Sequence, residues 1–130
     1  MTIDLSNATA NFGLDQIYDT KFPVGSTLNI RTGAVAGAEN ADAGTVLVGI
    51  TTPATPFSAA ATGSKSKNGT WSAAAAATGT AGHYRLTGTT TTNIEEGSVT
   101  ATGGGGDMTL DNVSIASAQT VSVATFTRTL

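Results

Sequence analysis

The chain has 130 residues, a formal net charge of -3 and no cysteine. This length allows one small domain, and without cysteines no disulfide framework can stabilise it. The six lysines and arginines are scattered and form no basic patch, so the composition argues against nucleic acid as a partner. No apolar run approaches the length that crosses a bilayer, and the first residues lack the basic and apolar regions of a signal peptide. We therefore expect neither a membrane-bound nor a secreted protein.

The predicted interior is small. Val, Ile, Leu and Phe together make up 25 of the 130 residues, whereas Thr contributes 25, Ala 21 and Gly 16. With few charges to repel one another, such a chain folds, but it has less apolar surface to bury than most domains. We therefore expect its native state to gain stability from contacts with neighbouring chains in an assembly.

The segment Asp4 to Phe22 is the one candidate helix. Ser6 or Asn7 can cap its start, and Pro23 ends it. A loose apolar stripe at helical spacing predicts which residues face the interior: Leu5, Ala8, Phe12, Leu14 and Ile17. Residues 1–26 are accordingly assigned to an N-terminal arm that is partly helical.

From residue 27 onward the pattern changes to alternation of apolar and polar residues. Strand-like segments recur every 10 to 20 residues or so, separated by Gly, Pro and Asn. They are expected at 28–32, 45–51, 83–87, 95–102 and 120–127. Residues 27–130 are therefore predicted to form a single β domain, mainly β in class, as a small β-sandwich or jelly-roll-like barrel.

The segment from Lys65 to Trp71 contains the sharpest local signal. Asn68-Gly69 is typical of a type I′ hairpin turn. Trp71 either fills the core or anchors an interface, and its large ring in a chain poor in aromatics favours the core. Lys65 and Lys67 share one face of the preceding strand, which is expected to be solvated, or else to meet a negatively charged partner.

The residues that carry catalysis are nearly absent. With one histidine, no cysteine and no Gly-x-Ser-x-Gly motif, we expect no enzyme. His83, next to Tyr84, is interpreted as a packing or interface residue. The spacing of Asp107 and Asp111 matches no calcium loop, so neither a metal nor another cofactor is expected. Glu95-Glu96 is interpreted as a solvated strand end, with pairing to a basic partner as the alternative.

Four consecutive glycines, Gly103, Gly104, Gly105 and Gly106, lack the Lys-Ser/Thr that completes a phosphate-binding loop. Their freedom suits a tight crossing of the chain or close contact with a neighbouring chain. They complete the set of candidate interface residues, which otherwise comprises Trp71, Lys65, Lys67, His83 and Tyr84.

Five segments, taken in order, carry a resemblance to a known family: Ile30 to Ala34, Ala43 to Leu47, Lys67 to Trp71, Ala77 to Arg85 and Gly97 to Asn112. Over roughly Leu28 to Phe126 the chain resembles a family of small virion structural proteins of tailed bacteriophages. The family has no catalytic motif to transfer to this sequence.

The resemblance implies a component of the virion that is made in the host cytoplasm. The first expectation is a capsid decoration (cement) protein, a homo-oligomer (dimer or trimer) on the outer capsid surface that contacts the major capsid protein. The alternative is a neck or tail component that contacts other virion proteins. A third hypothesis is a carbohydrate-binding or hydrolytic module, which would require Trp71, Tyr84 and His83 to cluster on the surface.

Overall fold

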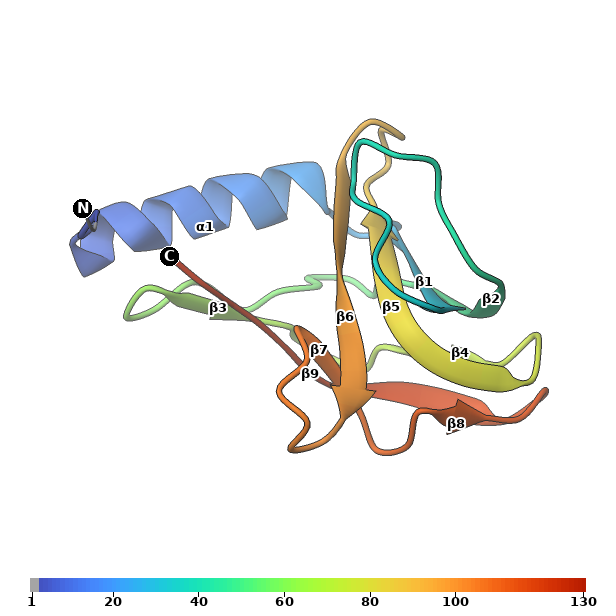
Figure 1. Ribbon diagram of the computed structural model, residues 1–130. Helices are drawn as coiled ribbons and strands as arrows, with labels where there is room; N and C mark the ends of the chain where they lie inside the picture. Colours follow the sequence, from blue (N-terminus) through green and yellow to red (C-terminus); the bar gives the residue numbers. More distant parts are fainter. Residues whose placement is uncertain (1–2) are drawn as a thin grey trace.

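Residues 3–130, the part of the chain that the computed structural model describes, contain one helix and nine strands that form a single sheet (Figure 1). The elements are α1 (Asn7–Lys21), β1 (Thr27–Thr32), β2 (Val46–Thr51), β3 (Ser64–Ser66), β4 (Ser72–Ala74), β5 (Gly79–Thr87), β6 (Ile94–Ala101), β7 (Met108–Leu110), β8 (Ser114–Ile115) and β9 (Thr120–Thr129). The expected class, mainly β with a short N-terminal helix, is confirmed.

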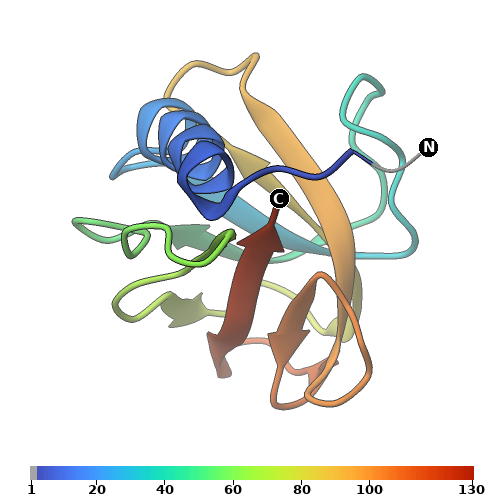
Figure 2. The ribbon, with the colours of Figure 1, turned by 90° about the vertical axis from the view of Figure 1, so that its left-hand side faces the viewer.

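The sheet is curled into a half-barrel. Its strand order is β2-β1-β5-β6-β7-β9-β3, with β4 also paired to β9 and β8 to β5. All pairs are antiparallel except β6 with β7. Beyond β4, the Ala76 amide donates to the Leu47 carbonyl on β2 at 2.8 Å. This bond brings the first strand of the order toward the last ones, so the sheet curls around its own interior (Figure 2).

Aromatic rings fill that interior. Trp71 is 1% exposed, and its ring centroid lies 5.3 Å from those of both Phe57 and Phe126. Tyr84 packs on Phe126, and Tyr18 packs on Phe57 with a centroid separation of 5.1 Å. The prediction that Trp71 belongs to the core is confirmed, and rings that each bury about 150–250 Å² compensate for the scarcity of large aliphatic side chains.

Helix α1 begins and ends where its sequence signals predict. The Ser6 hydroxyl accepts a hydrogen bond from the Thr9 amide, and the helix ends at Lys21, just before Phe22 and Pro23. The residues predicted as an N-terminal arm thus pack into the same core as the strands, since Leu14 and Phe22 belong to the core cluster.

The predicted buried stripe of the helix was wrong in part. The residues that face the core are Ala10, Leu14 and Tyr18, spaced by four. Phe12 is 67% exposed and Ile17 is 45% exposed. Tyr18 displaces them because its ring packs on Phe57 while its hydroxyl reaches the half-buried carboxylate of Glu95, a combination that hydrophobic periodicity does not detect.

The predicted type I′ hairpin at Asn68-Gly69 was also wrong. Gly69 has positive φ (+73°), as predicted, but Asn68 does not, and the strands on either side both pair with β9 rather than with each other. The I′-like reversal lies at Thr62-Gly63, where φ is 51° and 72° and Ala61 and Ser64 exchange two backbone hydrogen bonds. A β-branched residue at positive φ is a weak turn signal, so the sequence pointed to the wrong position.

The four glycines form a tight crossing within the chain. They connect β6 to β7, which run parallel with Val99 opposite Met108. Gly103 and Gly105 have positive φ, and the Gly106 amide donates to the Thr100 hydroxyl at 2.9 Å. Parallel strands usually need a crossover of a dozen or more residues. A connection as short as the one between β6 and β7 therefore requires the conformational freedom of glycine.

Candidate functional site

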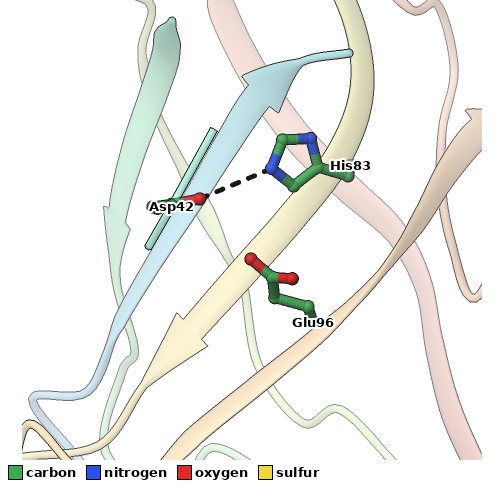
Figure 3. Close-up of side chains that lie close together, drawn as sticks. All are labelled: Asp42, His83 and Glu96. Atoms are coloured by element: carbon green, nitrogen blue, oxygen red, sulfur yellow. Dashed lines mark ion pairs between the residues drawn. The ribbon is translucent and has the colours of Figure 1, made fainter. Parts of the chain in front are cut away.

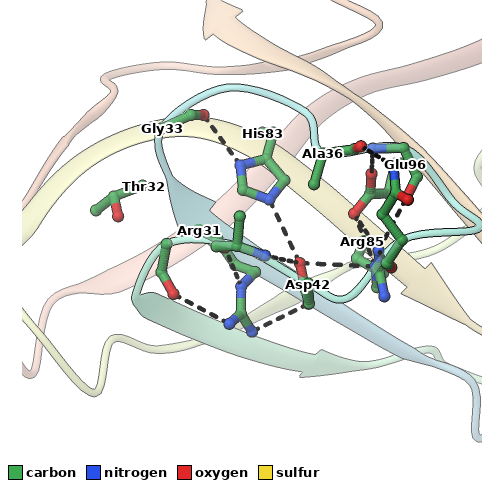
Figure 4. A network of polar contacts seen from close by, with 12 residues as sticks. Arg31, Thr32, Gly33, Ala36, Asp42, His83, Arg85 and Glu96 are labelled. Carbon is green, nitrogen blue, oxygen red and sulfur yellow. Dashed lines mark hydrogen bonds and ion pairs between the residues drawn. The ribbon is translucent and has the colours of Figure 1, made fainter.

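A cluster of ionic side chains holds the loop 33–44 against the sheet. It consists of Arg31 on β1, Asp42 in the loop, His83 and Arg85 on β5, and Glu96 on β6 (Figure 3, Figure 4). The three strands are neighbours in the order β1-β5-β6, so their side chains on one face converge on the loop that connects β1 to β2. We call these five residues the loop clasp.

Arg85 and Glu96 hold the middle of the loop. The Arg85 guanidinium lies 2.6 Å from the Glu96 carboxylate and donates to the carbonyls of Gly37 and Asn40 at 3.3 and 2.9 Å. The other Glu96 oxygen accepts the Gly37 amide at 2.7 Å. Because the Glu96 side chain is only 1% exposed, this loop backbone is fixed by charge-assisted hydrogen bonds out of solvent.

Arg31 and Asp42 hold the end of the loop. Nη1 of Arg31 lies 3.1 Å from Oδ2 of Asp42, and the same guanidinium donates to the carbonyls of Ala43 and Gly44 at 2.8 and 3.1 Å. Arg85 Nε also approaches Oδ1 of Asp42, at 3.6 Å. Arginines thus hold both the middle and the end of the loop.

His83 lies at the centre of the clasp and is completely buried. Its Nδ1 lies 3.0 Å from the Gly33 carbonyl oxygen, and its Nε2 lies 3.5 Å from Oδ1 of Asp42 (Figure 3). Among the described residues Nε2 has no hydrogen-bond partner. Buried polar atoms are rarely left unpaired, which makes this nitrogen the most unusual group in the site.

The arrangement meets one geometric requirement of a metal site but not the electrostatic one. One ligand atom each from Asp42, His83 and Glu96 lies within 4.8 Å of the others. Both carboxylates, however, are already paired with Arg31 and Arg85, which balance two negative charges with two positive ones. A divalent cation would add two further positive charges to a buried site, at a large electrostatic cost. The clasp therefore does not fit a metal ion.

A second ionic network lies on the opposite side of β6 and ties the helix to the sheet. Glu95 accepts from the hydroxyls of Tyr18 and Tyr84 and pairs with Arg128 on β9 at 2.7 Å. Burial, reinforced by the Glu95 charge, raises the pKa of both tyrosines, so their hydroxyls stay protonated. Burial opposes the charge on Arg128, but Glu95 outweighs it and the pKa of Arg128 is raised. The expectation of a solvated Glu95-Glu96 pair was wrong, because these adjacent residues point to opposite faces and each meets an arginine.

Lys65 is the clearest case in which the sequence misled. Its side chain was expected to be solvated, yet the residue is 2% exposed and its Nζ lies 2.7 Å from Asp15 and 3.0 Å from Asp19 on α1. Nζ also donates to the Ser58 carbonyl at 2.9 Å. Burial alone would lower the pKa of Lys65, but the two carboxylates raise it. The spacing of Asp15 and Asp19, one helical turn apart, is a signal that could have revealed this pair.

The candidate interface residues divide into two groups. Trp71, Lys65, His83 and Tyr84 are buried inside the chain. This confirms the core position of Trp71 and the packing interpretation of His83, and it leaves none of the four side chains exposed to a partner. Lys67 is half-buried, Gly103 to Gly105 are exposed and Gly106 is half-buried, and their interface role stays a prediction. The residues missed as surface features are Phe12, Ile17 and Leu130, all large, apolar and exposed on or beside α1.

In the part of the chain from residue 3 onward, no helix is both long and apolar enough to cross a membrane. Comparisons with protein-family models, with curated proteins and with solved structures found no match to this chain.

Proposed function

We propose that this protein is a non-enzymatic structural component of a bacteriophage virion, and specifically a capsid decoration protein. In this role it binds the outer surface of the head and bridges neighbouring subunits of the major capsid protein. Two observations support this proposal: the resemblance over Leu28 to Phe126 and the exposed apolar side chains at α1.

The observation that carries the proposal is the set of exposed apolar side chains along α1. Phe12 is 67% exposed, Ile17 is 45% exposed and Leu130 is 53% exposed. Leu130 lies against the helix, because a Cβ at Gly13 would come within 3.2 Å of its side chain. These three side chains, all at or beside one helix, are the apolar residues that we expect a partner to cover.

The charge distribution supports the same function. Four of the six basic side chains form ion pairs within the chain, namely Arg31, Lys65, Arg85 and Arg128. The exposed surface consists mostly of Thr, Ala, Ser and Gly and carries few cations. Such a surface suits contact with protein rather than with a polyanion. Many copies bound to a repeating lattice add avidity, so each individual contact can be weak.

The test compares purified particles with and without the protein. Particles that lack it should release their DNA at a lower temperature, and adding back the protein should restore resistance. A Phe12→Ser/Ile17→Ser double variant should bind these particles poorly, whereas Val35→Ser, which alters an exposed residue of the loop 33–44, should bind normally. Unchanged heat resistance of deficient particles would refute the decoration role.

The neck or tail role is the second candidate and is separated by copy number. A lattice protein is present in hundreds of copies per particle, whereas a ring component is present in about six or twelve by symmetry. Quantitative protein counting on purified particles distinguishes the two. The carbohydrate-binding hypothesis loses its basis, because Trp71, Tyr84 and His83 are all buried and offer no face to a sugar.

A further inference from the structure

The buried His83 ring stands between two hydrogen-bond acceptors. The Gly33 carbonyl oxygen faces Nδ1 at 3.0 Å, and the Asp42 carboxylate faces Nε2 at 3.5 Å (Figure 4). A neutral imidazole carries one N–H, so either tautomer leaves one ring nitrogen facing an acceptor without a proton between them. Only the imidazolium, with two N–H groups, donates to both.

The charged groups around the ring come from every element packed against it. Arg31 on β1 and Arg85 on β5 oppose a positive charge on His83, whereas Asp42 in the loop and Glu96 on β6 favour it. Of these, Asp42 is the one that meets the ring at close range, and it belongs to the loop rather than to the sheet. Protonation of the ring therefore strengthens the attachment of the loop to the sheet.

We propose that His83 is a proton-operated latch for the loop 33–44. When the ring is protonated, it binds both ends of the loop, through the Gly33 carbonyl and the Asp42 carboxylate. When the proton is lost, one ring nitrogen and the oxygen that faces it are both acceptors with no hydrogen between them, and the loop loosens. Arg31, Arg85 and Glu96 still hold the loop in part. Residues Ala38 to Ala41 of the loop line a groove with Thr91, Thr92 and Ile94, so the latch controls the shape of that surface.

A metal ion is the alternative to a proton as the group between Nε2 of His83 and the Asp42 carboxylate. A single proton adds one charge, whereas a divalent cation adds two beside Arg31 and Arg85. The proton is therefore the less costly of the two occupants, because it adds half the charge and Asp42 faces it directly. Measurements with EDTA and with added Zn²⁺ distinguish the proton from a metal ion.

The experiment measures amide hydrogen exchange of the loop, above all at Gly37, whose amide donates to Glu96, in buffers containing EDTA at pH 5.5 and pH 8. After correction for the intrinsic pH dependence of exchange, we expect opening of the loop to be about tenfold more frequent at pH 8, as the loss of one hydrogen bond to a charged group implies. Amides of β5 and β9 should keep their protection. Equal opening at the two pH values would overturn the latch.

Two variants sharpen the result. Asp42→Asn replaces the facing acceptor by an amide that can donate to a neutral ring, so its loop opening should no longer depend on pH. Glu39→Gln, an exposed carboxylate of the same loop, should retain the wild-type pH dependence. Wild-type dependence in Asp42→Asn, or its loss in Glu39→Gln, would contradict the proposed contact.

A measurement on the unaltered protein guards against variants that fold poorly. His83 is the only histidine, so its ring nitrogens give the only imidazole signals in a ¹⁵N spectrum. Both nitrogens should be protonated where the loop is protected, and one of them should lose its proton over the pH range in which the loop opens. Protection of the loop at pH 8 by added Zn²⁺ without EDTA would show a metal site and overturn the proposal.

Discussion

The two faces of strand β6 are stabilised by different means. On one face, Glu95 lies beside a core of stacked aromatic rings and joins α1, β5 and β9. On the other face, Glu96 belongs to the loop clasp, where a loop backbone is held by ions and a buried histidine. The first region is an apolar core with a polar network at its border, and the second is a polar network with little apolar contact. We therefore expect the first to set global stability and the second to open locally.

The largest effect should come from the aromatic face. Trp71→Ala removes the ring that contacts both Phe57 and Phe126 and leaves a cavity at the centre of the core. We expect a loss of about 3–5 kcal/mol in the free energy of unfolding, measured by urea denaturation. A loss below about 1 kcal/mol would show that the aromatic cluster does not dominate this small core.

The adjacent glutamates compare the two faces directly. Glu95→Gln leaves Arg128 without its carboxylate and should cost about 2 kcal/mol of global stability. Glu96→Gln should cost about 1 kcal/mol, because Arg85 keeps Asp42 nearby at 3.6 Å, but it should expose the Gly37 amide to exchange. Urea denaturation and hydrogen exchange on both variants check this. The opposite pattern would reverse our assignment of the two regions.

Two glycines at positive φ provide a smaller, matched comparison. Gly33 (+85°) begins the loop 33–44 and Gly105 (+80°) lies in the β6–β7 crossing, and a Cβ would meet nothing within 4 Å at either position. Alanine at each should cost about 1 kcal/mol through backbone strain alone. Only Gly33→Ala should also speed exchange in the loop, since the Gly33 carbonyl contacts His83. Faster loop exchange in Gly105→Ala would argue against two separable regions.

The smallest effect concerns acid. The hydrogen bond from Lys65, together with that from the Ala60 amide, lowers the pKa of Asp15. Because the folded-state pKa lies below the unfolded one, Asp15 contributes stability above its unfolded value, and this is lost as pH falls through the folded value. Asp15→Asn should therefore lose less Tm than the wild type between pH 7 and pH 3, by a small margin because the Asp15 side chain is 38% exposed. Parallel Tm curves would contradict this.

Local signals in the sequence predicted local structure well. The Ser6 cap, the Pro23 stop, the alternating runs of β1 and β9 and the β-branched run of β2 reflect interactions within a few residues, so they can be read from the chain itself. Trp71 could be placed in the core for a similar reason, since few other residues are large enough to fill one. The candidate site could not be predicted, because its members come from three strands and a loop.

By itself, the sequence determined that this chain is a mainly β protein with one N-terminal helix and a core that depends on a few large rings, because side-chain periodicity and volume are properties of the residues alone. Only the tertiary structure decided which charges are buried. Lys65, Glu95 and Glu96 all look like surface residues in sequence, and each is accommodated in its buried or half-buried position because a partner 11 to 77 residues away reaches it. The electrostatic cost of burying a charge depends on those distant partners, and they are brought together by the curl of the sheet.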